Sequence, residues 1–109
     1  MKRYYSLILP LFLGGCAMVA LKPGAERIRL TKTEPGKECQ YIGEVTGSQS
    51  GTFTTSNVST DLGARNDLKN KALALGGDTV VIITDNVSSD KDGDIASIIL
   101  AGNVYKCSN

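Results

Sequence analysis

The sequence predicts a small α+β domain in which one helix packs on a mixed sheet of three or four strands, in the order β-(β-α-β-β). Two observations favour this class: one stretch has helical periodicity, and runs of strand-forming residues lie before and after it. A chain of 109 residues has room for one small core, because chains of this size bury only about 60% of their unfolded surface. Two lobes around a deep cleft are therefore excluded.

Four segments have the composition of strands. Residues 26–31 alternate charged and apolar side chains, which is typical of an edge strand. Residues 39–46 are rich in strand formers and form the first main strand in this interpretation. Residues 79–84 are a β-branched run, as expected of a strand covered on both faces. Residues 95–107 return as a long final strand.

The helix is expected between the first main strand and the β-branched run. Ser59 or Thr60 is suited to cap its first turn. Gly76 and Gly77 end it, because glycine readily adopts the left-handed conformation that follows many helices. The side chains predicted to face the sheet recur at spacings of four, four and three: Ala64, Leu68, Ala72 and Leu75.

A long polar loop is predicted between that strand and the helix. Residues 47–58 hold many Gly, Ser and Thr residues, and a structureless loop of this length is either functional or mobile. Phe53 is the large apolar side chain in its middle. It either anchors the loop in the core or is displayed to a partner.

A second polar stretch, residues 85–94, is acidic and partly resembles a calcium-binding loop. An EF-hand loop requires Gly at position six and Glu at position twelve. Counted from Asp90, these positions hold Ile95 and Ala101. We therefore expect a solvated hairpin loop and no metal site.

Cys39 and Cys107 are expected to form a disulfide, and this pairing selects the strand order. The helical crossover makes the 39–46 and 79–84 strands parallel, and the final strand runs back as a hairpin. If the 79–84 strand were central, the two cysteines would lie about 9.5 Å apart, too far for a disulfide. The final strand is therefore predicted to be central.

Composition excludes several functions. The formal charge of +1 provides no basic surface for a phosphate backbone, so nucleic acid is not an expected partner. The chain has no histidine, which is the commonest general base near neutral pH and a common metal ligand. Its cysteines form no C-x-x-C motif. We expect no catalytic residues, no enzyme activity and no cofactor.

The first residues predict an export signal and a lipid anchor. Lys2 and Arg3 precede an apolar run, residues 4–13, which is too short to cross a membrane as a permanent helix. The run ends in Leu13-Gly14-Gly15-Cys16, the pattern of a bacterial lipobox. Residues 1–15 are thus predicted to be a signal peptide, and Cys16 to carry covalent lipid after cleavage.

The mature chain is expected to begin at Cys16. Residues 16–25 form the lipidated N-terminus and a tether, and residues 26–109 form the α+β domain. Ala17 follows the lipidated cysteine, and the absence of Asp there indicates the outer membrane as the destination. Without Lys2 and Arg3, ten basic residues remain against eleven acidic ones, a formal charge of −1.

Three stretches and the lipobox carry a family resemblance. They are CQYIGEVTG at 39–47, DLKNKALALGGDTVVI at 67–82 and GNVYKC at 102–107. Together they resemble the YjeI-like small bacterial lipoproteins of the domain-of-unknown-function 4156 family, for which the resemblance implies no established activity. More remotely, the layout is similar to the YbjQ-like domains and to the outer-membrane sensor lipoprotein of the Rcs phosphorelay. That sensor looks like a domain with two disulfides, whereas only Cys39 and Cys107 are available here.

These observations predict an outer-membrane lipoprotein that faces the periplasm and binds another envelope component, an unknown protein partner. The contact is expected through the 47–58 loop or an exposed sheet edge, with Phe53, Tyr41 and Tyr105 as candidate contact residues. The alternative is an envelope-stress sensor. A small hydrolase or redox protein is disfavoured by the missing histidine and C-x-x-C motif.

Overall fold

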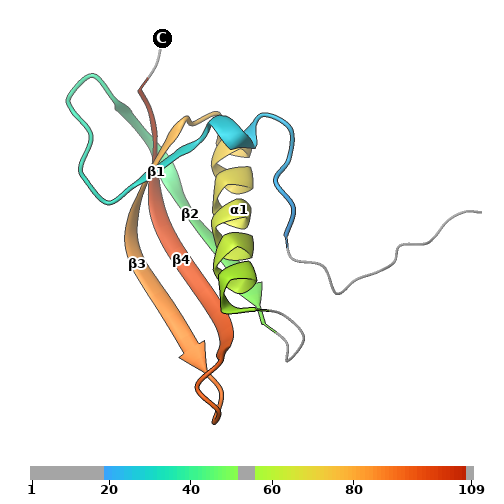
Figure 1. Ribbon diagram of the computed structural model, residues 1–109. Coiled ribbons are helices and arrows are strands. Elements are labelled where there is room, and N and C mark those ends of the chain that lie inside the picture. The colour runs from blue at the N-terminus through green and yellow to red at the C-terminus, as the bar shows by residue number, and fades with distance from the viewer. Residues whose placement is uncertain (1–18, 52–55, 108–109) are drawn as a thin grey trace, which may run out of the picture.

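The computed structural model describes residues 19–51 and 56–107, which form a four-stranded sheet with a helix packed along one face (Figure 1). Within these residues the helix is long and the strand at one edge is very short. The elements in chain order are the 3-10 helix η2 (Ala25–Arg27), β1 (Arg29–Thr31), β2 (Gln40–Ser50), α1 (Asn57–Leu75), β3 (Thr79–Ser89) and β4 (Ile95–Lys106).

The sheet has the order β1-β3-β4-β2. β4 runs antiparallel to both β3 and β2, and β1 pairs parallel with β3 at the edge. The predicted fold class is confirmed, including the central position of the final strand. Arg29 and Thr31 pair with Thr79 and Val81, so β1 covers only the first three residues of β3.

The core lies between α1 and the sheet. Ala64, Leu68 and Ala72 of the predicted helical stripe are fully buried there. Leu75 is 45% exposed, so its predicted place in the core is wrong. Leu75 is the last residue of α1 and lies over Gly43. Because Gly43 has no side chain, Leu75 stays partly uncovered. The helix packs on the buried side chains Val80, Ile82, Ile98, Leu100 and Val104.

Both strands that flank β4 are longer than predicted. Residues 47–50 and 85–89 were expected in loops, yet they belong to β2 and β3. Both stretches pair with the first half of β4, residues 95–100. Pairing on both sides of one apolar strand outweighs the weak strand propensity of their Ser, Gly and Asp residues.

The helix also begins earlier than expected. Ser56, not Ser59 or Thr60, is its N-cap, and its hydroxyl accepts the Ser59 amide at 3.0 Å. Thr60 instead donates its hydroxyl to the Ser56 carbonyl at 3.1 Å and is buried. Gly76 ends α1 in the left-handed conformation with φ 89°, as its position predicted.

Residues 19–25, assigned from sequence to a free tether, pack on the domain. They run beside α1 (Figure 1), and Ala25 is fully buried. The packed structure therefore includes residues from Val19 onward, seven positions before the domain boundary predicted at residue 26. The polar contacts that hold this segment come from Gln49, Asn66 and Asn70, discussed below.

Candidate functional site

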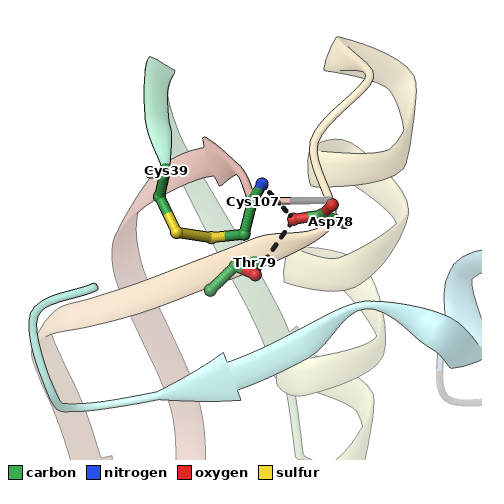
Figure 2. Close-up of a disulfide and its surroundings, with 4 residues drawn as sticks. All are labelled: Cys39, Asp78, Thr79 and Cys107. Carbon is green, nitrogen blue, oxygen red and sulfur yellow. Dashed lines mark hydrogen bonds between the residues drawn. A yellow bond between two sulfur atoms is a disulfide. The ribbon is translucent and has the colours of Figure 1, made fainter. Parts of the chain in front are cut away.

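The Cys39–Cys107 disulfide joins the start of β2 to the end of β4 (Figure 2). The sulfur atoms are 2.05 Å apart and the Cα atoms 4.0 Å apart. This is the pairing that the sequence analysis expected, and it follows from β2 and β4 lying side by side in opposite directions. The bond fixes the far end of the connection that leads from β1 to β2.

Asp78 connects the disulfide to the edge of the sheet. Its carboxylate accepts the Cys107 amide at 2.8 Å and the Thr79 hydroxyl at 3.0 Å (Figure 2). Its backbone accepts the Arg29 amide at 3.0 Å and donates to the Tyr105 carbonyl at the same distance. One residue thus joins β1, β3 and β4, which is a structural role.

A cavity of about 240 Å³ lies between the β1–β2 connection and this end of the sheet. Its walls combine hydroxyls, carboxylates and one guanidinium group with apolar surface that includes Pro35 and the disulfide. The two wall cysteines are bonded to each other, so neither offers a free thiol. The cavity therefore has the groups to hold a small polar molecule but not those of a nucleophilic site. Its lining includes Arg29, Thr31, Glu34, Glu38, Cys39 and Cys107.

Two of the three predicted contact residues lie together on the strands. Tyr41 and Tyr105 face each other across β2 and β4, with ring centroids 5.7 Å apart and an interplanar angle of 71°. Such an edge-to-face pair stabilises the sheet, and Tyr41 is still 54% exposed. Phe53 and Cys16 lie outside the described residues.

Carboxylates of the acidic 85–94 stretch contact groups of the protein itself. Asp90 accepts the backbone amides of Asp92 and Asp94 at 2.9 and 3.0 Å. Asp85 lies 3.7 Å from Lys32. No group of three or more His, Cys, Asp or Glu residues within 19–51 and 56–107 is arranged to hold a metal ion.

The outer edge of β2 is blocked by two side chains of the helix. Asp67 accepts the Ser48 amide at 2.9 Å, and Lys71 donates to the Thr46 carbonyl at 2.8 Å. Asp67 and Lys71 also form an ion pair at 3.2 Å. Backbone groups that would otherwise attract an additional strand are thus occupied.

We expect Asp67→Ala to lower the free energy of unfolding by about 1 kcal/mol, because the hydrogen bond to the Ser48 amide and the ion pair with Lys71 are lost together. Urea denaturation measures this. Asp61→Ala is the matched control, since Asp61 also pairs with a residue four positions later, Arg65, but lies in a more exposed setting. Its effect should stay within about 0.5 kcal/mol. Equal losses in both variants would contradict the special role of Asp67.

The outer edge of β3 differs from that of β2. β1 ends at Thr31 opposite Val81, and no strand of the described chain pairs with this edge further along. Residues 83–89 are all exposed, and Ile83 and Val87 are apolar side chains 46% and 53% exposed. We call residues 83–89 the free edge of β3. It is the feature of the fold best suited to bind an extended segment of another chain.

A family model, "Domain of unknown function (DUF4156)", matches residues 19–107. The chain belongs to the DUF4156 family. Its match begins at Val19, whose amide donates to Gln49 Oε1. The DUF4156 chain is 33% identical to "Uncharacterized protein YjeI" of Escherichia coli K12 over 91% of its own length and 89% of that protein. The protein of the same name from Shigella flexneri matches with the same identity and coverage.

A solved structure shares the fold of this DUF4156 chain. It is described as a protein of unknown function of the DUF74 family from Pediococcus pentosaceus. The TM-score is 0.58 at 15% identity, with 74% of this chain and 98% of the other covered. None of the described helices is long and apolar enough to cross a membrane.

Sequence reasoning missed the polar side chains that hold residues 19–22 of this DUF4156 domain. Gln49 was placed in a loop, and Asn66 and Asn70 were not singled out. Both asparagines are over nine-tenths buried. Their spacing of four within a helix was the available signal, because it places two amides one turn apart on the same side.

Proposed function

We propose that the protein is a lipid-anchored component of the outer membrane that faces the periplasm and binds another envelope component through the free edge of β3. The contrast between the two sheet edges is the observation that carries the binding role. The edge of β2 is occupied by Asp67 and Lys71, whereas the free edge of β3 is exposed along seven residues.

The lipid anchor is inferred from the chain's N-terminal pattern. Leu13-Gly14-Gly15-Cys16 has the order of a lipobox after a short apolar run. Val19, the first described residue, follows Cys16 by three positions, so a lipid on Cys16 would hold the domain close to the membrane. Two or three acyl chains on one cysteine hold a protein firmly on a bilayer.

The free edge of β3 favours strand addition as the binding mode. Backbone amides and carbonyls along an unpaired edge give affinity, and alternate side chains give selectivity. Ile83 and Val87 supply apolar contacts, while Asp85 is already close to Lys32. The expected partner is an extended segment of an envelope protein.

We expect this binding role to involve no catalysis, cofactor or metal. The chain lacks histidine, and its two cysteines in the domain are joined. The relatives named above have no assigned role, so the alternative of an envelope-stress sensor rests on the sequence resemblance alone.

The anchor is tested by Cys16→Ala. The unchanged chain should sediment with membranes in cell fractionation, and mass spectrometry should detect acyl chains on Cys16. The variant should be neither acylated nor retained by membranes. Membrane retention of the variant would contradict the lipid anchor, and Ala17→Asp should shift the chain to the inner membrane if Ala17 sets its destination.

The binding edge is tested by site-specific crosslinking in intact envelopes. A photoreactive amino acid at Val87 should yield one discrete protein adduct, whereas the same amino acid at Ser48, on the blocked edge, should yield none. Ile83→Lys should remove the Val87 adduct without unfolding the domain, since Ile83 is 46% exposed. An adduct at both positions, or one that survives Ile83→Lys, would contradict the proposed edge.

A further inference from the structure

The segment that leads into the domain is held by four hydrogen bonds. The Val19 amide donates to Gln49 Oε1 at 2.6 Å, and Asn66 Nδ2 donates to the Val19 carbonyl at 3.0 Å. Asn70 Nδ2 donates to the Ala20 carbonyl at 2.8 Å, while Asn70 Oδ1 accepts the Lys22 amide at 2.8 Å. Because Asn66 and Asn70 are buried, water competes little for these bonds.

This segment runs in the same direction as α1. Val19 lies beside Asn66, Lys22 beside Asn70, and Gly24 against Leu73. Figure 1 shows the segment following the side of the helix. From Gly24 back to Val19, the described segment therefore runs towards the N-terminal turns of α1.

The number of residues before Val19 limits where a lipid on Cys16 can lie. Val19 follows Cys16 by three positions, and three fully extended residue steps span at most about 11 Å. Leu62 and Val58 precede Asn66 by one and two turns, about 6 and 12 Å along the helix axis. A bilayer surface at Cys16 is thus within reach of both side chains.

The outer side of α1 has the composition of a membrane-facing surface. Val58 is 76% exposed and Leu62 45% exposed, and the basic residues Arg65 and Lys69 continue the same side at helical spacing. Arg65 is paired with Asp61 at 3.0 Å, and no ion pair links Lys69 to another described residue. Apolar residues with adjacent cations favour an anionic lipid surface.

We propose that the outer face of α1, formed by Val58, Leu62, Arg65 and Lys69, rests on the phospholipid surface, where the docked segment 19–22 holds it. This inference rests on the lipid anchor proposed above. The helix covers one face of the sheet, so this orientation turns the uncovered face away from the membrane. Tyr41 and Tyr105 would then be presented to the periplasm.

The test uses the acylated protein in vesicles of phosphatidylethanolamine and phosphatidylglycerol at 3:1. An environment-sensitive fluorophore is attached through Leu62→Cys or, as the matched control, through Ile99→Cys, since Leu62 and Ile99 are both 45% exposed. Ile99 lies on β4 with its side chain on the uncovered face, next to buried Ile98 and Leu100 on the helix face. Nitroxide-labelled phospholipid should quench the Leu62 label at least threefold more than the Ile99 label.

Equal quenching at the two positions, or stronger quenching at Ile99, would overturn the proposed orientation. Inserting twelve Gly and Ser residues between Met18 and Val19 should reduce quenching at Leu62 at least twofold while the protein stays on the vesicles. Unchanged quenching would overturn the role of the docked segment. Protein that does not sediment with the vesicles would refute the lipid anchor itself. Protein that sediments with the vesicles but shows equal quenching of the two labels would refute only the orientation.

Discussion

Replacing both domain cysteines, in the variant Cys39→Ser with Cys107→Ser, is expected to lower the free energy of unfolding by about 4 kcal/mol. The bond links residues 68 positions apart, and opening so large a loop restores much conformational entropy to the unfolded chain. For a domain of this size, that loss corresponds to a fall in Tm of roughly 15 to 30 °C. Urea and thermal denaturation of the two forms measure the difference.

The background for this comparison is the Cys16→Ala chain, which removes the third cysteine and leaves the disulfide in place. The double variant should unfold at a lower urea midpoint with a steeper slope, because an unfolded chain without the crosslink is more expanded. A loss below about 1 kcal/mol would contradict the prediction. It would show that the pairing of β2 with β4 holds Cys39 beside Cys107 without the covalent bond.

The topology of the sheet was predictable because the cysteines added a distance constraint to the strand pattern. Helical periodicity identified α1, and β-branched runs identified the buried parts of β3 and β4. Neither pattern decides which strand is central. The need to bring Cys39 and Cys107 within disulfide distance decided it, and the observed β4 position agrees.

The strand ends were not predictable from composition. Ser48, Ser50, Ser88 and Ser89 have weak strand propensity, so residues 47–58 and 85–94 looked like loops. Their extended conformation comes from pairing with β4, which is a tertiary effect. The docking of residues 19–22 was missed for a similar reason, since their backbone groups are satisfied by side chains 30 to 50 positions away.

The candidate site was predictable only in part. An exposed sheet edge was one of two predicted contact regions, but the sequence did not show which edge is free. That distinction depends on Asp67 and Lys71, whose side chains reach backbone groups of β2 across the helix–sheet interface. On sequence alone, a charged pair four residues apart on a helix is a solvent-exposed ion pair.

Gly47→Ala is expected to lower the free energy of unfolding by about 3 kcal/mol, because the helix lies directly against the backbone of β2 at this glycine. A methyl group there would come within 2.5 Å of the Leu68 amide nitrogen and 2.6 Å of the Ala64 carbonyl oxygen. Both contacts are backbone atoms of a buried helical stripe, so no side-chain rotation relieves them. Forcing additional atoms into a packed core costs about 1–3 kcal/mol or more.

Gly43→Ala, four residues earlier on the same strand, provides the matched control. Its added methyl would meet only Leu75 Cδ1, at an ordinary contact distance of 3.5 Å. A glycine-to-alanine change without strain reduces the entropy of the unfolded chain and stabilises by about 0.4–1 kcal/mol. The two substitutions should therefore have opposite signs in urea denaturation. Similar stabilities would mean that α1 moves away from β2 at little cost, and the close helix–strand contact at Gly47 would then not hold the two elements together.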